Sequence, residues 1–260
     1  MSAFAVAERD RARDRILELA RADARVVAAA VVGSMADGPG DRWSDLDLTF
    51  GLAPGVQNAD VLDDWTRELE REFQVVTLFD LPFQTSLYRV FLLPGNLQVD
   101  LSFTPASGFG ALGPRFKLLF GEAVSRAAPP PPSSHHLFGL AVHHAVRARI
   151  CIERGRLWQA EHWISGVREQ ALAIACLEQG FESAYARGAD RLPVKTLARF
   201  AGALVRSIER EELLRALGCA VEVLLDHRRA AEAFGAGIDA TLRDLVSAGW
   251  AGPPPASPPA

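Results

Sequence analysis

Residues 44–50 read Ser-Asp-Leu-Asp-Leu-Thr-Phe, a stretch in which polar and apolar residues alternate with a period of two. This period predicts a β-strand whose leucines and phenylalanine face a core, while Asp45 and Asp47 project from the opposite face. Two carboxylates at such a short distance repel each other. This repulsion raises the pKa of one of them unless a cation lies between them. The stretch therefore predicts a strand that carries a site for a divalent cation, with the oxygen ligands that Mg²⁺ or Mn²⁺ prefers.

The segment before this strand predicts a second part of the same site. Residues 25–32 form an apolar, β-branched run that is typical of a strand buried on both faces, and the run stops at Gly33-Ser34. A glycine and a serine at this point predict a tight turn into a helix. The backbone N–H groups of the turn, the serine hydroxyl and the positive end of such a helix would together favour phosphate binding.

A third carboxylate follows later in the chain. In residues 97–103, Leu-Gln-Val-Asp-Leu-Ser-Phe, Asp100 is the only acid in what otherwise reads as a core strand. If this strand lies beside residues 45–50, three carboxylates meet on one patch, which is enough for two metal ions bound jointly with a triphosphate. An isolated Asp-x-Asp pair is more often a solvated turn, and Asp100 alone would be a surface acid. The combination of the Asp-x-Asp pair with Asp100 favours a site for metal ions and a triphosphate.

The other patterns predict an α+β fold. Residues 8–21 and 59–73 have the spacing of amphipathic helices, and residues 74–79 and 88–93 are strand candidates. The predicted organisation is a mixed sheet with flanking helices over 1–127, a proline-rich linker over 128–134, an all-α helical bundle over 135–248 and a disordered proline-rich tail over 249–260. The helices expected in the bundle span 135–154, 157–179, 193–207, 210–228 and 229–247.

The composition limits the classes of partner. The 260 residues include 49% hydrophobic and 23% charged residues, and the net charge is −4, so no basic surplus predicts binding to nucleic acid or to an acidic membrane. Three widely spaced cysteines fit neither a disulfide framework nor a zinc site. No apolar run approaches the length of about 18 residues that a membrane span needs, and the N-terminus lacks a signal-peptide pattern. We therefore expect a cytoplasmic protein with a small-molecule or protein partner.

The motif resembles that of the nucleotidyltransferase (polymerase-β-like) superfamily, and within it the bacterial antibiotic (aminoglycoside- and lincosamide-type) and minimal nucleotidyltransferases. The residues that carry the resemblance are Gly33, Ser34, Ala36, Gly38, Ser44, Asp45, Leu46, Asp47, Leu48 and Asp100. The resemblance implies that Gly33, Ser34 and Ser44 bind the nucleotide. It also implies that Asp45 and Asp47 bind Mg²⁺, with two ions expected and Mn²⁺ as an alternative. Asp100 would complete the metal site as a catalytic carboxylate.

The resemblance further implies transfer of a nucleoside monophosphate from a nucleoside triphosphate such as ATP to a hydroxyl of a small acceptor, such as an aminoglycoside- or lincosamide-like antibiotic, with release of pyrophosphate. The helical region would then bind the acceptor. Glu169, or alternatively Glu161, is the candidate general base on the helix predicted over 157–179. Two other interpretations stay open. The chain could be a nucleotidyltransferase that acts as an antitoxin by modifying a protein, or a nucleotide-binding regulator without catalytic activity. A monomer and a homodimer are both compatible with the sequence.

Overall fold

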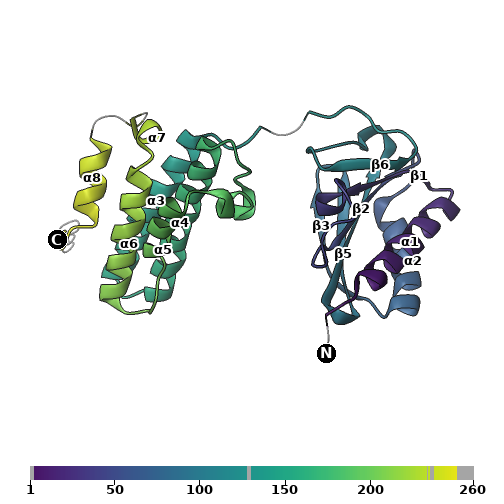
Figure 1. Cartoon of the computed structure of the whole chain (residues 1–260), viewed down its shortest axis with the longest axis horizontal. Coiled ribbons are helices and arrows are strands. Elements are labelled where there is room, and N and C mark those ends of the chain that lie inside the picture. The colour runs from purple at the N-terminus through teal and green to yellow at the C-terminus, as the bar shows by residue number, and fades with distance from the viewer. Residues whose placement is uncertain (1–2, 128–129, 233, 235–236, 251–260) are drawn as a thin grey trace, which may run out of the picture. The chain divides into compact units, whose positions relative to one another are not determined.

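The computed structural model describes residues 3–127, 130–232, 234 and 237–250. The chain divides into two compact units, Met1–Pro129 and Pro130–Ala260, which are drawn in Figure 1 and described separately below. Among the described residues, no helix combines the length and the apolar composition that crossing a bilayer requires.

The first unit contains a six-stranded mixed sheet. The strands are β1 (Val26–Val32), β2 (Leu46–Leu52), β3 (Val76–Phe83), β4 (Ser86–Leu93), β5 (Leu97–Pro105) and β6 (Phe116–Phe120). Their spatial order is β3-β4-β5-β2-β1-β6, in which β2 and β5 are parallel and the other neighbours are antiparallel. The α+β class and the mixed sheet are therefore confirmed, whereas β6 was not predicted from the sequence.

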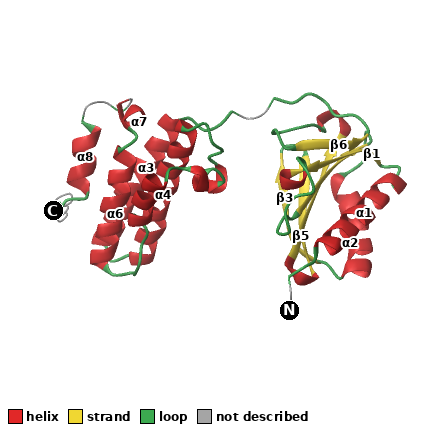
Figure 2. Cartoon of the chain, in the orientation of Figure 1, coloured by secondary structure: helices red, strands yellow, loops and turns green. Residues whose placement is uncertain are grey.

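Two helices, α1 (Val6–Ala22) and α2 (Asn58–Phe73), cover one side of this sheet, as Figure 2 shows. The alternating apolar residues of β2 and β5 point into this side and pack with the helices in one core. At its centre the rings of Phe50, Trp65 and Phe103 lie 5.0–5.2 Å apart, centroid to centroid. Because side chains alternate along a strand, the polar residues of β2 and β5 lie on the opposite face.

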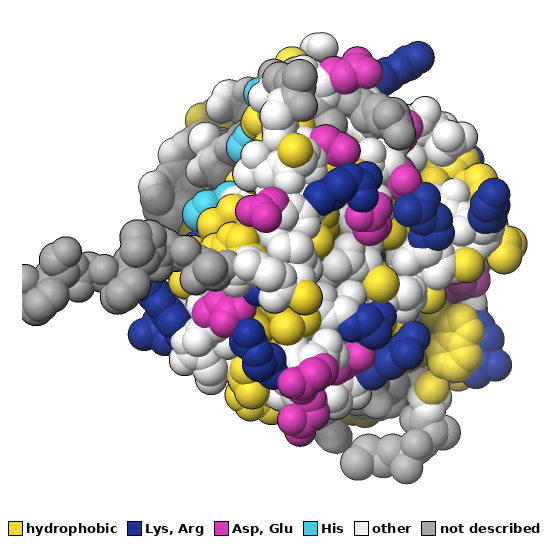
Figure 3. Space-filling model, turned by 90° about the vertical axis from the view of Figure 1, so that its left-hand side faces the viewer, with side chains coloured by type: hydrophobic (Ala, Val, Ile, Leu, Met, Phe, Trp, Pro, Cys, Tyr) yellow, Lys and Arg dark blue, Asp and Glu magenta, His cyan; other side chains and the backbone are white. Residues whose placement is uncertain are grey.

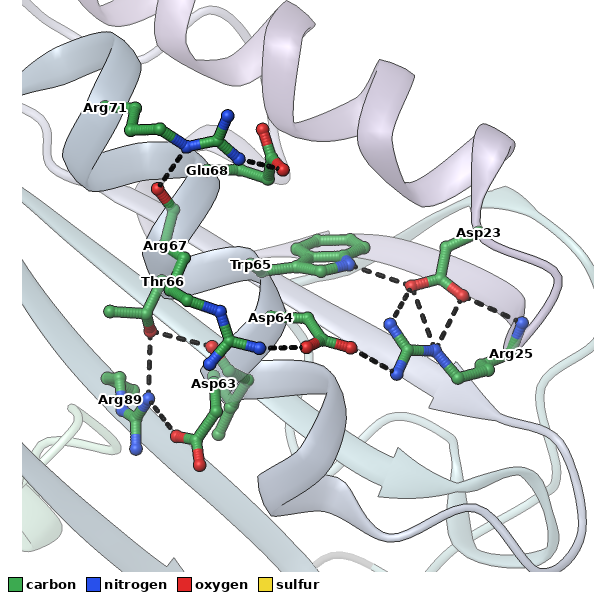
Figure 4. A network of polar contacts seen from close by, with 11 residues as sticks. Asp23, Arg25, Asp63, Asp64, Trp65, Thr66, Arg67, Glu68, Arg71 and Arg89 are labelled. Carbon is green, nitrogen blue, oxygen red and sulfur yellow. Dashed lines mark hydrogen bonds and ion pairs between the residues drawn. The ribbon is translucent and has the colours of Figure 1, made fainter.

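A network of charged side chains fixes the turn between α1 and β1 onto α2, as Figure 4 shows. Asp23 accepts hydrogen bonds from the guanidinium of Arg25 at 2.8 Å and from Trp65 Nε1 at 3.0 Å. Arg25 also donates to Asp64 Oδ2 at 2.7 Å. The hydrogen bond from Arg25 is the main reason that the pKa of Asp23 is lowered to about 2, and the bond from Trp65 adds to it. The Asp23 carboxyl is therefore ionised at any pH well above 2.

The second unit is helical. Its helices are α3 (Ser134–Glu153), α4 (Leu157–Glu178), α5 (Val194–Gly202), α6 (Arg210–Leu225), α7 (Arg228–Glu232) and α8 (Ile238–Leu245). Buried side chains of α3, α4 and α6 form most of its core. Basic and acidic side chains are interspersed on the face that Figure 3 shows, so this face carries no stripe of one sign.

Two predicted helices of this unit have the wrong extent. The helix predicted over 193–207 ends at Gly202, because Arg215 donates to the carbonyls of Gly202 (2.6 Å) and Leu204 (2.8 Å) and so satisfies the backbone of the turn. The helix predicted over 229–247 is two helices, with Gly237 as the N-cap of the second. Glycine disfavours a helix interior, and this stretch has two of them within three residues.

The predicted linker and tail fall partly outside the described residues, at 128–129 and 251–260. Helix α3 begins at Ser134, so the predicted linker is one residue too long. Trp250, which the prediction placed in the disordered tail, packs against the helical core and lies 4.8 Å from the Arg149 guanidinium, measured to the ring centroid. An aromatic side chain with an apolar surface to cover explains this difference.

Candidate active site

The three predicted aspartates lie at the start of β2 and in the first half of β5. The two strands are adjacent, and Asp47 and Asp100 are direct partners in their parallel register. Asp45 lies two residues before Asp47, immediately ahead of β2. All three side chains are half-buried. The structure therefore places the three carboxylates at one end of two adjacent central strands, on the polar face of the sheet. This agrees with the predicted pairing of these strands.

The electrostatics of this edge favour a cation. Burial raises the pKa of the Asp100 carboxyl, and the negative charge of Asp45 raises it further. A hydrogen bond from Gln98 Nε2 to Asp100 Oδ1, at 3.1 Å, opposes this shift. A divalent cation between the carboxylates would relieve their repulsion.

The donor set fits Mg²⁺ in its chemistry. All the candidate ligands are carboxylate oxygens, and Mg²⁺ commonly takes one or two carboxylates while it keeps several of its own waters. Among the described residues, no group of three or more His, Cys, Asp or Glu side chains is arranged so that it could hold a metal ion. Asp45, Asp47 and Asp100 therefore lie on neighbouring strands without their carboxylates converging on one point.

The turn after β1 lies directly against one of these carboxylates. Gly33 has a φ of +70°, and a Cβ atom at this position would lie only 2.2 Å from Asp47 Oδ2. A side chain at residue 33 is therefore excluded both by the backbone conformation and by the carboxylate. The helix predicted to follow Gly33-Ser34 is wrong, because the chain makes only one turn of 3-10 helix, Gly33–Met35. Ser34 is exposed on this turn.

Hydrogen bonds fix the loop between this turn and β2. They come from Ser44 inside the loop and from Arg9 of α1, which was not predicted from the sequence to have this role. The Ser44 hydroxyl accepts from the backbone N–H of Asp41 at 3.0 Å and donates to Asp41 Oδ1 at 3.1 Å. Arg9 of α1 is 1% exposed and donates to the carbonyls of Pro39 (2.9 Å), Asp41 (2.6 Å) and Ser44 (3.3 Å). Ser44 therefore shapes the loop, while its predicted contact with a nucleotide stays a prediction.

Hydroxyl groups continue along the polar face beyond the aspartates. Thr49 follows Asp47 on β2, and Ser102 and Thr104 follow Asp100 on β5, each two residues further on the same side. Ser86 and Thr104 share a buried hydrogen bond of 2.6 Å between their hydroxyl oxygens. These hydroxyls line a cavity of about 200 Å³.

Larger side chains form the rest of this cavity. Tyr88, Phe109 and Phe116 line it, together with the arginines Arg115 and Arg126. Burial raises the pKa of Tyr88, although a hydrogen bond with the side chain of Ser102 opposes the shift. The cavity therefore offers neutral hydroxyls, aromatic surface and two cations on the same face as the carboxylates. The spacing of Ser102 and Thr104 after Asp100 was a sequence signal for it.

The two candidate general bases lie on α4, in the other unit. Glu169 is exposed, and Glu161 Oε1 accepts a hydrogen bond from the Ser165 hydroxyl at 2.7 Å. The two glutamates belong to the second unit, whereas the three aspartates belong to the first. A role as general base stays a prediction for both.

Comparisons with known proteins add little to this geometry. No protein-family model matches the chain, and no curated protein matches its sequence. One solved structure that aligns with it is the crystal structure of an aminoglycoside 6-adenyltransferase from Bacillus subtilis, over 90% of this chain and 95% of that chain. The sequence identity is 12% and the TM-score is 0.38, a likeness too distant to support an inference about this chain.

Proposed function

We propose that this protein is a nucleotidyltransferase, which transfers a nucleoside monophosphate from a nucleoside triphosphate to a hydroxyl of a small acceptor. The observation that supports this proposal best is the parallel pairing of Asp47 with Asp100, with Asp45 beside them and the backbone of Gly33 against the Asp47 carboxylate. Three carboxylates next to a glycine turn suit a magnesium-bound triphosphate.

In this proposal each part of the site has one task. Asp45, Asp47 and Asp100 would hold one or two Mg²⁺ ions. When bound, the metal neutralises charge on the phosphates and lowers the pKa of the attacking hydroxyl. The acceptor oxygen forms a bond to the α-phosphorus, the bond between that phosphorus and the bridging oxygen breaks, and pyrophosphate leaves. The hydroxyl proton passes to a base, for which Glu169 remains the candidate predicted from the sequence.

The remaining residues would bind and orient the nucleotide. The backbone of Gly33 lies against the Asp47 carboxylate. In this proposal the N–H groups of Gly33 and Ser34 would bind phosphate oxygens of the nucleotide. The hydroxyl-lined cavity can accept hydrogen bonds from, and donate them to, a sugar or phosphate, and Arg115 and Arg126 on its wall favour a negatively charged ligand. Such a reaction depends mainly on positioning and electrostatics, so the protein needs few further groups.

The acceptor proposed here is a small hydroxylated molecule such as an aminoglycoside- or lincosamide-like antibiotic. The test incubates the full chain with each of the four ribonucleoside triphosphates, Mg²⁺ and a panel of such antibiotics. Pyrophosphate release that depends on an acceptor, with a mass gain of one nucleoside monophosphate on that acceptor, is the expected result. Transfer to a protein alone would instead favour the protein-modifying interpretation.

Two variants and one control link this activity to the site. Asp45→Asn and Asp47→Asn should each reduce pyrophosphate release by at least about 100-fold, because each removes a charged ligand at the reacting phosphates. Asp60→Asn is the matched control, since Asp60 is an exposed acid in the first turn of α2. Release that no acceptor stimulates, or that survives both site variants, would refute the proposal.

A further inference from the structure

The strand β3 leaves a large amount of apolar surface exposed. It lies at one edge of the sheet, beside β4. Every residue of this strand is exposed. Five large apolar side chains of β3 are each 43–58% exposed, namely Val76, Leu78, Phe79, Leu81 and Phe83. Contiguous apolar patches of this kind mark interaction sites on soluble proteins.

Most of these side chains lie on the polar face of the sheet. Phe79 pairs with Val90, and Val90 pairs with Asp100. Direct partners on neighbouring strands project from the same face, so Phe79 shares the face of Asp100. It lies two strand spacings away, or about 10 Å. The pairing of β3 with β4 assigns four residues to this face, which we call the β3 strip: Val76, Phe79, Leu81 and Phe83.

The backbone of β3 is poorly suited to pairing with a further strand. Pro82 has no N–H group to donate, and the register with β4 shifts between Thr77 and Phe79. Proline and bulges at the edge of a sheet hinder the addition of another strand. A partner would therefore contact β3 through the side chains of its face and not through its backbone.

The β3 strip carries no charge. Asp80 is the only charged residue of β3, and Arg89 donates to both of its carboxylate oxygens at 2.7 Å. This hydrogen bonding lowers the pKa of Asp80. Arg89 also donates to Thr66 of α2 at 2.9 Å, so the ion pair lies on the face that the helices cover. A two-fold contact brings the same patch of two copies together, and an uncharged patch avoids repulsion between like charges.

We propose that the β3 strip is a dimer interface, on which the same strip of a second copy of this chain packs about a two-fold axis. Half-exposed side chains of this size leave on the order of 400 Å² of mainly apolar surface on each copy. Two copies, with the side chains beside the strip, would bury about 1,000 Å², which is near the lower limit for a specific interface. We therefore expect a dissociation constant of roughly 1–100 µM. This inference does not depend on the proposed function.

The first test is sedimentation equilibrium of the full chain over about 1–300 µM, a range that includes the expected dissociation constant. The mass should rise with concentration from 28.1 kDa towards twice that value. A mass that stays at 28.1 kDa over the whole range would overturn the proposal.

A matched pair of variants locates the contact. Leu81→Lys places a charge near the middle of the β3 strip and should weaken association at least about tenfold. Leu118→Lys is the control, because Leu118 is 41% exposed on β6, at the other edge of the same sheet. It should associate like the parent, and circular dichroism checks that both variants are folded. A dimer that survives Leu81→Lys, or one that both variants weaken equally, would overturn the proposal.

Mixing two variants tests whether the strip contacts its own copy. Leu81→Lys and Leu81→Glu should each be monomeric alone, and their equimolar mixture should form a dimer because opposite charges then meet across the interface. A mixture that stays monomeric would show that the strip does not face itself. A dimer without any nucleotidyl transfer would refute the proposed function alone, and an active monomer would refute only this inference.

Discussion

The substitution Gly33→Ala tests whether the turn after β1 and the Asp47 carboxylate form one site. The added Cβ would lie 2.2 Å from Asp47 Oδ2, about 0.8 Å closer than the 3.0 Å below which real Cβ contacts essentially never fall. The carboxylate therefore has to move by close to 1 Å. The φ of +70° adds a backbone cost of about 1–2 kcal/mol for alanine. A displacement of this size at a reacting group reduces turnover by about 100-fold.

The assay is pyrophosphate release at saturating nucleotide and acceptor, together with urea unfolding to measure the lost stability. Gly38→Ala is the matched control, because Gly38 lies in the following loop, has no positive φ and would place its Cβ in open space. We expect the control to keep nearly full activity. If Gly33→Ala is folded and retains the activity of Gly38→Ala, the reaction does not depend on the position of the Asp47 carboxylate against this turn, and the inference that the two form one site is refuted.

Three further predictions concern stability, the loop and the metal. Because the folded-state pKa of Asp23 is about 2, below the unfolded value of about 3.9, its ion pair with Arg25 should stabilise the fold by about 1–2 kcal/mol above pH 4 and lose this contribution as the pH falls towards 2. Urea unfolding of Asp23→Asn against the parent should show that difference at pH 7 and none near pH 2, and a pH-independent difference would contradict it. Arg9→Met should speed amide hydrogen exchange of residues 40–44 and lower the free energy of unfolding by about 2 kcal/mol, since three carbonyls lose a charged donor; faster exchange confined to other loops would contradict this. EDTA should abolish pyrophosphate release and added Mg²⁺ or Mn²⁺ should restore it, whereas release that persists in EDTA would exclude a metal-dependent reaction.

The strand that carries Asp45 and Asp47 could be predicted because its physical cause is local. Alternation with a period of two determines which side chains reach the core, and it needs no knowledge of the rest of the chain. The same rule gave the polar face of the strand that carries Asp100. The sequence did not show whether these two strands are neighbours, so the three-carboxylate patch was predicted only on the assumption that they are. The structure shows that β2 and β5 are paired.

Features that depend on distant partners were not predictable in this way. Arg9 looks like one of many charges on an amphipathic helix, and only the fold shows that the loop 39–44 covers it. The end of α5 at Gly202 depends on Arg215 from another helix. Strand β6 is short and is stabilised by pairing with β1 rather than by its own pattern. The roles of Ser44 and Glu169 depend on ligands, so they remain predictions.

The parallel pairing of β2 and β5 has a consequence for the order in which the protein folds. Parallel strands cannot be joined by a hairpin, and here the chain forms α2, β3 and β4 between them. Asp47 and Asp100 therefore approach each other only after a long-range contact closes, a step that costs loop entropy and is typically slow. A nascent chain that has not yet produced β5 lacks the third carboxylate. If the proposed metal site forms, its affinity would accordingly appear late, as a property of the completed sheet.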